Sequence, residues 1–146
     1  MDDELRVAVR TMALVGRKLE RSAAPLTLPQ YRVLTLIAHA PERASRLAQR
    51  ADVTKATLTG VIDALVTHGW IERSDVAGDR RGVSLALTLD GAAVLEQAEA
   101  RMCAWLSEVL ALLGPESSDR VTVGVATLGD ALAAHRETRE AAPVVG

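Results

Sequence analysis

The stretch ASRLAQRADVTKATLTGVIDALVTHGWIERSDVAGDRRGVSLALT, residues 44–88, decides the fold. Its first half carries apolar residues at helical spacing, whereas its second half alternates apolar and polar residues with a period of two. The alternation covers residues 70–73 and 83–87, and residues 74–82 between them are rich in Asp, Gly and Arg. The stretch therefore predicts helices followed by a β-hairpin with a long, polar and charged tip.

Two helices separated by a tight turn are expected in the first half. A short helix should cover residues 44–50, with Leu47 facing inward. Thr54 is a good N-cap for the next helix, and Gly69 can take the left-handed conformation that ends it. The apolar face of this second helix consists of Leu58, Val61, Ile62 and Leu65. This arrangement predicts a helix-turn-helix.

Helical patterns also precede this stretch. Thr27 and Gln30 have the spacing of a capping box, with Pro29 in the first turn, so a helix is expected over residues 28–39. Residues 4–21 carry an apolar stripe at helical spacing. A helix at the N-terminus cannot bury such a stripe on itself, so it must pack on another part of the chain or on a second chain.

A long helix is expected after the hairpin. Thr88 can cap it, and it should run to about Leu113, where the Gly-Pro pair at 114–115 breaks it. A last helix should continue to about His135, and residues 141–146 are expected to form a disordered tail. Three short helices followed by a hairpin is the order of a winged helix-turn-helix. The expected fold class is therefore mainly α with a minor β part, namely a winged lobe with long flanking helices.

The composition limits the classes of protein to which the chain can belong. The chain has 146 residues, 49% apolar and 25% charged, which is typical of one globular domain. A single cysteine excludes an internal disulfide framework and a multi-cysteine zinc site. No apolar run could span a bilayer and no signal-peptide core is found, so a cytoplasmic location is expected. The net charge of −2 gives no global signal of nucleic-acid binding, although residues 28–90 carry eight basic against seven acidic residues.

The second helix of the helix-turn-helix presents polar residues opposite its apolar face. In a helix-turn-helix its first turn enters the major groove, where N–H groups and small polar side chains approach phosphates and base edges. The candidate DNA-binding residues at these positions are Thr54, Lys55, Ala56, Thr57 and Thr59. A solvated helix face with a good cap explains the same residues equally well on spacing alone.

The hairpin tip carries Asp79, Arg80 and Arg81 between two glycines. Arginine is the usual side chain for probing a narrow minor groove, where the electrostatic potential is most negative. Arg80 and Arg81 are therefore further candidate DNA-binding residues. Asp79 can brace the wing by pairing with Arg73 across the hairpin. A polar turn with its charges simply in water is the alternative.

Residues 47–91 resemble the MarR family of bacterial transcription regulators. The resemblance rests on Leu47-Ala48, on Thr57 and Leu65, on Gly69-Trp70-Ile71-Glu72-Arg73, on Asp79-Arg80-Arg81, and on Leu85-Ala86-Leu87-Thr88 before Gly91. The helices on either side extend it over nearly the whole chain. The motif of an acid and an arginine two residues apart, followed by a strand that ends in Leu-Thr, is specific.

The resemblance implies a sequence-specific regulator of transcription that binds a pseudo-palindromic double-stranded operator as a homodimer. Residues 1–27 and 89–140 would be the helical dimerisation region, and residues 28–88 the DNA-binding lobe. The expected function is a repressor released by a small ligand or oxidant that changes the spacing of the two recognition helices. By the family pattern Arg81 reaches the minor groove, and Asp79 with Arg73 braces the wing.

One position departs from the family pattern. Gly60 stands where many family members carry a longer, often basic residue. A glycine costs helix stability of about 1 kcal/mol relative to alanine and supplies no contact. Base readout should therefore depend on Lys55, Thr57 and Thr59.

Other reactive residue types do not form recognisable sites. Cys103 lies beside Met102 and Trp105 in the middle of a helix, so a buried structural cysteine is expected rather than a redox sensor. The three histidines are far apart and lack the partners of a metal site. The chain shows no nucleophile–base pair and no phosphate loop, so neither enzyme activity nor a cofactor is expected.

The ligand and two alternative functions stay open. With no phenylalanine and only three aromatic residues, a pocket would be lined by aliphatic side chains and by methionines such as Met12 and Met102. Such a pocket suits a small apolar ligand. One alternative is a winged-helix module that binds proteins rather than DNA, which the acidic pI suits. The other is a constitutive repressor without an effector.

Overall fold

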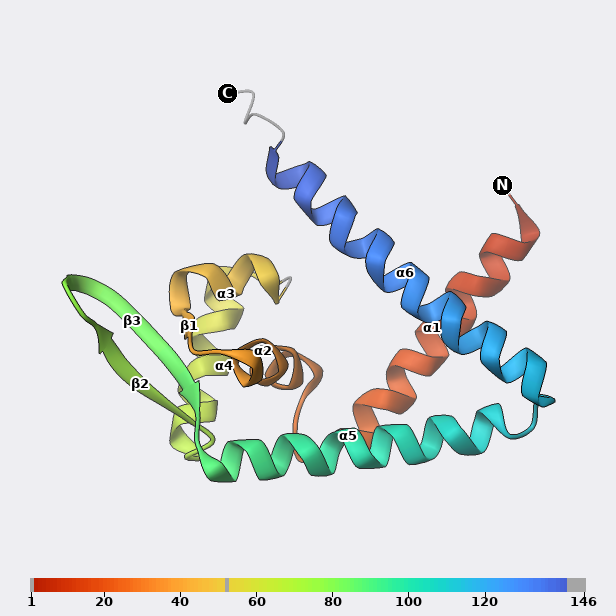
Figure 1. The fold of residues 1–146 in the computed structure, drawn as a ribbon, viewed down its shortest axis with the longest axis horizontal. Coiled ribbons are helices and arrows are strands. Elements are labelled where there is room, and N and C mark those ends of the chain that lie inside the picture. Colours follow the sequence, from red (N-terminus) through yellow and green to blue (C-terminus); the bar gives the residue numbers. More distant parts are fainter. Residues whose placement is uncertain (1, 52, 142–146) are drawn as a thin grey trace. The chain divides into compact units, whose positions relative to one another are not determined.

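The computed structural model describes residues 2–51 and 53–141 (Figure 1). Two compact units make up the chain, Met1–Ala104 and Trp105–Gly146. The first contains α1 (Asp3–Ser22), α2 (Leu28–His39), β1 (Glu42–Arg43), α3 (Ala44–Arg50), α4 (Lys55–Thr67), β2 (Ile71–Val76) and β3 (Asp79–Leu87). Helix α5 (Leu89–Leu110) begins in the first unit, and the second unit holds its end and α6 (Pro115–Ala141). This order confirms the mainly α fold class with a winged helix-turn-helix.

The helices of the lobe begin at the capping residues that the sequence predicts. Thr27 Oγ1 accepts the Gln30 N–H at 3.3 Å, and Gln30 Oε1 accepts the Thr27 N–H at 2.9 Å, so the capping box of α2 is complete. At the start of α4, Thr54 Oγ1 accepts the Thr57 N–H at 3.1 Å. These caps fix where each helix begins and therefore which side chains lie in the first turn of α4.

One apolar core joins the helix-turn-helix to the sheet. The largest fully buried side chains in it are Val33, Leu34, Leu47, Leu65 and Leu85, which come from α2, α3, α4 and β3. Burying a side chain of this size stabilises the fold by roughly 1.5–3 kcal/mol. Leu58 and Ile62 extend the core along α4, which leaves the opposite face of that helix in solvent.

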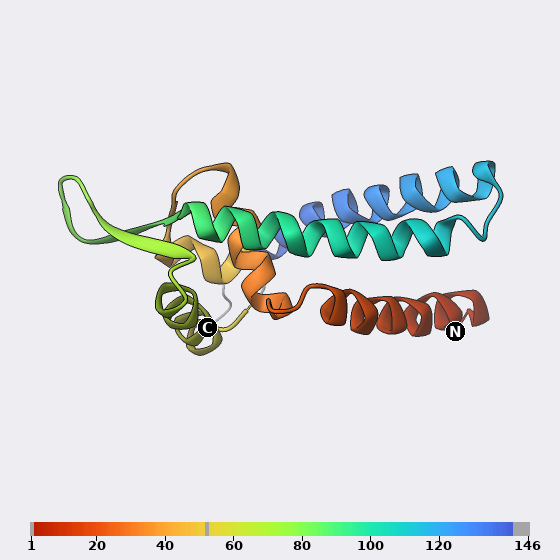
Figure 2. The ribbon, with the colours of Figure 1, turned by 90° about the horizontal axis from the view of Figure 1, so that it is seen from below.

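The sheet has three strands in the order β1-β3-β2, and both pairings are antiparallel. The pairing of β2 with β3 runs from Ile71 and Leu87 at the base to Asp75 and Val83. After a register shift there, Val76 pairs with Asp79 beside the turn, so residues 80–82 of β3 form an irregularity near the tip. Gly78 in that turn has a φ of 77°, a conformation that favours glycine. The hairpin extends beyond the helices of its lobe and forms the wing (Figure 2).

Two features of the sheet differ from the sequence-based expectation. The expected long tip over residues 74–82 is shorter in the structure, with a tight turn at 77–78, paired strand at 74–76 and 79, and an irregular stretch at 80–82. Backbone pairing does not require apolar side chains, so the loss of alternation hid these strand residues. The third strand, β1, is a two-residue segment whose Glu42 and Arg43 pair with β3. A segment this short carries no periodic pattern.

The start of α5 is held against the base of the wing. Thr88 Oγ1 donates to the Gly69 carbonyl at 2.6 Å and accepts the Gly91 N–H at 3.0 Å, so the predicted cap is present. A Cβ at position 91 would lie 1.8 Å from the Trp70 carbonyl oxygen. Only glycine permits this close approach of α5 to the backbone before β2. Gly69 ends the preceding helical turn with a φ of 71°, as predicted.

The last two helices end at other residues than expected. Helix α5 ends at Leu110 rather than near Leu113, because residues 111–113 already form a turn before the Gly-Pro pair. Helix α6 continues past His135 to Ala141, since residues 136–141 contain no glycine or proline to break it. The expected tail begins at the last residue of α6, and residues 142–146 lie outside the described residues.

Helices α1 and α6 expose much of their apolar surface. On α1, the side chains of Leu5, Val7, Val9, Met12 and Leu14 are each at least 48% exposed, and no residue of this helix is buried. On α6, the exposed apolar residues include Val121, Val123, Val125, Leu128 and Leu132. Apolar surface of this extent is typical of a protein interface.

Candidate nucleic-acid interface

The first turn of α4 is exposed and carries small polar side chains. All five candidate residues at this end of α4 are exposed: Thr54, Lys55, Ala56, Thr57 and Thr59. Thr54 Oγ1 donates to Thr57 Oγ1 at 2.9 Å in addition to accepting the Thr57 N–H, so the two hydroxyls are fixed side by side. The other N–H groups of a first turn have no partner within the helix, and the positive end of the helix dipole lies there. This end of α4 is therefore suited to bind a phosphate group.

The exposed face of α4 carries one cation and one acid. Lys55, Thr59 and Asp63 are spaced four residues apart, so they form a single stripe along the helix. Thr59 Oγ1 donates to the Lys55 carbonyl at 3.0 Å, which directs this hydroxyl back to its own helix. Sequence reasoning identified Lys55 and Thr59 but not Asp63.

An ion pair joins α4 to the wing. Nη2 of Arg73 in β2 donates a hydrogen bond to Oδ1 of Asp63 at 2.5 Å. Both side chains are about half exposed, 47% for Arg73 and 60% for Asp63. Arg73 is thus held by the recognition helix. The side chain of Asp79 lies outside the described part of the chain, so its pairing with Arg73 stays a prediction.

The wing tip brings the other predicted residues to the start of β3. Asp79, Arg80 and Arg81 follow the turn directly and belong to the strand, whereas the sequence predicts a loop. The side chains of all three lie outside the described part of the chain. The backbone places these residues at the tip of the hairpin, and their contacts with DNA stay a prediction.

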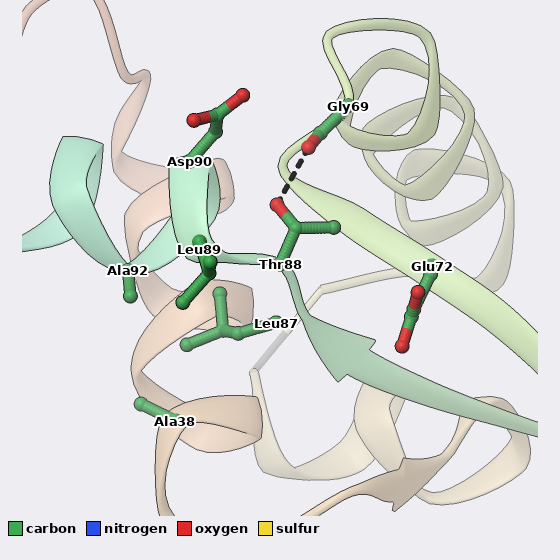
Figure 3. A pocket seen from close by; sticks show the side chains of 8 residues that line it. All are labelled: Ala38, Gly69, Glu72, Leu87, Thr88, Leu89, Asp90 and Ala92. Carbon is green, nitrogen blue, oxygen red and sulfur yellow. Dashed lines mark hydrogen bonds between the residues drawn. The ribbon is translucent and has the colours of Figure 1, made fainter.

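An open groove of about 810 Å³ lies at the base of the wing. Figure 3 shows that α2, β2, the end of β3 and the start of α5 all contribute to it, with Glu72 and Asp90 as its charged residues. The expected ligand-lining residues Met12 and Met102 do not line this groove. Met102 is instead buried in the core of the first unit, and Met12 is exposed on α1.

A smaller groove follows α1. It has a volume of about 310 Å³, and its lining consists of Leu14, Arg17, Lys18 and Arg21. Three cations beside one aliphatic side chain favour an anion with an apolar body. The sequence pattern of α1 indicated its apolar stripe but not this groove.

Tyr31 of α2 contacts α5. Its hydroxyl donates to Glu99 Oε1 at 3.3 Å. Burial raises the pKa of Tyr31, and the charge and hydrogen bond of Glu99 and the nearby Cys103 raise it further.

The expectation that Cys103 is buried is wrong, because its side chain is exposed. Met102 takes the buried position on this turn of α5, and the next residue is rotated by about 100° around the helix.

Within the described ranges, no group of three or more His, Cys, Asp or Glu side chains could hold a metal ion. His39 Nδ1 lies 3.0 Å from the Thr35 carbonyl, and His68 stacks on Trp70 with ring centroids 4.3 Å apart. None of the helices in the described ranges is long and apolar enough to cross a membrane.

Comparison with known proteins identifies the family. The MarR family model matches residues 26–83. The repressor YetL of Bacillus subtilis is 33% identical over 104 residues, which cover 69% of this chain and 60% of YetL. The multiple antibiotic resistance protein MarR of Salmonella typhimurium is 35% identical over 99 residues, 63% of this chain and 69% of that protein. The regulator YfiV of Bacillus subtilis is 30% identical over 129 residues, 88% of this chain and 81% of YfiV.

The chain belongs to the MarR family. Its relatives are transcriptional regulators rather than enzymes. Apo MarR from E. coli has a TM-score of 0.74 at 26% identity, with 88% of this chain and 98% of that chain covered. The repressor CouR, bound to a 23-mer DNA duplex, has a TM-score of 0.72 at 26% identity and coverage of 84% and 89%.

A third MarR-family structure contains a small acid. Rv2887 of Mycobacterium tuberculosis, in complex with salicylic acid, has a TM-score of 0.67 at 26% identity, with 84% of this chain and 93% of that chain covered. The MarR resemblance seen in the sequence, and the winged helix-turn-helix that it implies, are therefore confirmed.

Proposed function

We propose that this MarR-family chain is a transcriptional repressor that binds a pseudo-palindromic DNA operator as a homodimer and leaves it when a small ligand binds. The observation that carries the proposal is the exposed N-terminus of α4, capped by Thr54, beside a wing with arginines at its tip. The similarity to the repressor YetL and to DNA-bound CouR supports it.

The first turn of α4 reads the major groove in this proposal. Lys55 and Thr57 contact base edges, and the methyl group of Thr59 packs on the bases, since its hydroxyl is directed back to the helix. The N–H groups of the turn bind a phosphate, and Thr54, whose hydroxyl proton is donated to Thr57, contributes its backbone N–H. Ala56 is small enough to let the backbone of the helix approach the DNA.

The wing reads the minor groove in this proposal. Arg80 and Arg81 follow the tight turn at the tip, where an extended hairpin can reach past the recognition helix. A narrow minor groove attracts arginine through its negative potential. Arg73 and Asp79 brace the wing, which keeps the tip arginines at one distance from α4.

The homodimer is supported by the exposed apolar residues of α1 and α6. Residues 1–27 and 89–140 form the dimerisation region in this proposal, and residues 28–88 form the DNA-binding lobe. A two-fold dimer places its two recognition helices about one helical turn of DNA apart, roughly 34–36 Å. Because its partner is DNA, the proposal includes a cytoplasmic location.

The ligand in this proposal is a small carboxylic acid with an apolar body. The groove along α1 supports this class, because Arg17, Lys18 and Arg21 can bind a carboxylate while Leu14 contacts the apolar part. The similarity to Rv2887, which was crystallised with salicylic acid, supports the same class. This class refines the small apolar ligand that composition alone suggests.

Selection of duplexes from a random-sequence library by the purified protein tests the proposal. It predicts enrichment of a pseudo-palindrome with half-sites about one helical turn apart. Affinity for the selected duplex should fall steeply with salt, because phosphate contacts release counterions. Lys55→Ala and Thr57→Ala should change which bases are preferred, with about 1–3 kcal/mol of discrimination per contact.

The same experiment separates this function from the alternative of a winged-helix module that binds proteins. Such a module has no need of Lys55 together with two arginines at the wing tip. It would enrich no sequence, and its binding to a selected and to a scrambled duplex would be equal. Either result would contradict the proposal.

A further inference from the structure

Two connections join the DNA-binding lobe of the proposed function, residues 28–88, to the dimerisation region. One is the segment between α1 and α2, and the other is the step from β3 into α5. The orientation of the lobe depends on how these two connections are held to each other. The inference drawn from them rests on the proposed function, because it concerns the spacing of the two lobes on DNA.

Arg101 of α5 binds the first of these connections. Its Nε donates to the Ser22 carbonyl at 3.1 Å, and its Nη2 donates to the Ala24 carbonyl. Ser22 is the last residue of α1, where the carbonyls have no partner within the helix and the negative end of the helix dipole lies. A guanidinium carries several N–H donors in one plane, so it is suited to bind two carbonyls at once.

The same turn of α5 also packs on this connection. Ala98 and Met102 of α5 belong to one buried core with Ala23. Such burial stabilises the contact but has no preferred direction, so it does not by itself fix the angle at which α1 leaves the lobe. The two hydrogen bonds of Arg101 are directional and hold the end of α1 in one orientation on α5.

We propose that Arg101 is a positioning residue for operator recognition, which holds the α1–α2 connection on α5 and thereby sets the separation of half-sites that the dimer accepts. Each base pair added between two half-sites moves one of them by about 3.4 Å along the duplex and about 35° around it. A dimer whose lobes are held at one angle discriminates against such a change. A dimer with looser lobes follows it more easily, but must order its lobes when it binds the correct separation.

Arg101→Met tests this role, because methionine keeps an extended side chain and removes the N–H donors. The wild type should bind the selected duplex more tightly than the same duplex with two base pairs inserted between its half-sites. Arg101→Met should bind the selected duplex about fivefold more weakly than the wild type, the change that a hydrogen bond of usual strength corresponds to. Its affinity for the inserted duplex should not fall, so its discrimination between the two separations decreases by about fivefold.

Arg10→Met is the matched control. Arg10 is exposed on α1, on the side opposite Met12, since two residues rotate a helix by about 200°. Among the described residues it has no hydrogen bond or ion pair. This variant loses the same charge and gains the same side chain, and it should keep the wild-type discrimination between the two separations.

Arg101→Lys separates the geometry of the guanidinium from its charge. Lysine keeps the positive charge near the end of α1, but its single ammonium group lacks the planar set of donors that binds both carbonyls. It should therefore lose discrimination as Arg101→Met does, and it provides the test if methionine at this position prevents folding. Fluorescence anisotropy gives the affinities, sedimentation shows that each variant is still a dimer, and circular dichroism shows that it is folded.

Four results would overturn the inference. They are wild-type discrimination in a folded, dimeric Arg101→Met or Arg101→Lys, an equal loss of discrimination in Arg10→Met, a wild type that binds the selected and inserted duplexes equally, and an Arg101→Met variant weakened by the same factor on selected, inserted and scrambled duplexes. The last of these is the effect of a lost charge alone. All four leave sequence-specific DNA binding intact, whereas a wild type that selects no duplex would overturn the proposed function as well.

Discussion

Gly91 decides how closely α5 approaches the base of the wing. Its Cα faces the Trp70 carbonyl so directly that a Cβ would lie 1.8 Å from that oxygen. Gly91→Ala should therefore lower the free energy of unfolding by about 1–3 kcal/mol, because the backbone must move to admit the methyl group. Urea denaturation of the two proteins measures the difference. Equal stability would show that α5 can move away from Trp70 without cost.

Tyr31 provides a test of the contact between α2 and α5. Burial, and then Glu99 and Cys103, raise its pKa above the ordinary value of about 10. Since the folded-state pKa is the higher one, the contribution of Tyr31 to stability is present below the unfolded pKa and is lost as the pH rises through the folded pKa.

The ultraviolet absorbance of tyrosinate reports this pKa directly, because Tyr31 is the only tyrosine of the chain. The titration midpoint of the folded protein should lie above that of the protein in denaturant. Glu99→Gln should lower the midpoint part of the way, and burial should keep the rest of the shift. A midpoint that is the same in both solvents would exclude the contact.

Helix α4 contains a glycine that alanine can replace. A Cβ on Gly60 would meet nothing within 4 Å, and the residue is exposed inside the helix. Gly60→Ala should raise the free energy of unfolding by about 0.5–1 kcal/mol, because alanine loses less backbone entropy on forming a helix. Thermal and urea unfolding measure the gain. A lower free energy of unfolding for Gly60→Ala than for the wild type would contradict this prediction.

Local signals in the sequence predict most of the elements. The caps at Thr27, Thr54 and Thr88 fix the starts of three helices to the residue, because each cap is a contact within one turn. Gly69 and the apolar spacing of α4 are equally local. The sequence could therefore place the first turn of the recognition helix, and with it the exposed residues that form most of the candidate interface.

Contacts between distant residues could not be read in this way. Strand β1 exists only because Glu42 and Arg43 meet β3. The ion pair of Asp63 with Arg73 depends on the relative orientation of a helix and a strand. The exposure of Cys103 depends on which side of α5 packs on α2, and the apolar neighbours in the sequence do not reveal that side.

The whole molecule is expected to be a dimer. The reason is the exposed apolar surface of α1 and α6, which a second copy would cover. Sedimentation at micromolar concentration should give about twice the chain mass of 15.5 kDa. A truncation that removes residues 1–21 should dissociate or aggregate, since it deletes most of α1. A stable, soluble monomer of the full chain would rule out this assembly.

Binding of the selected duplex by the wild type and by Arg81→Ala tests the central claim, that the α4 N-terminus and the wing together read DNA. Fluorescence anisotropy should show the wild type binding this duplex at least about a thousandfold more tightly than a scrambled one. Arg81→Ala should weaken binding and reduce its salt dependence while the thermal melt stays unchanged, because a residue at the wing tip is far from the core. Equal affinity of the wild type for both duplexes, or an Arg81→Ala variant that binds as tightly as the wild type, would contradict the claim.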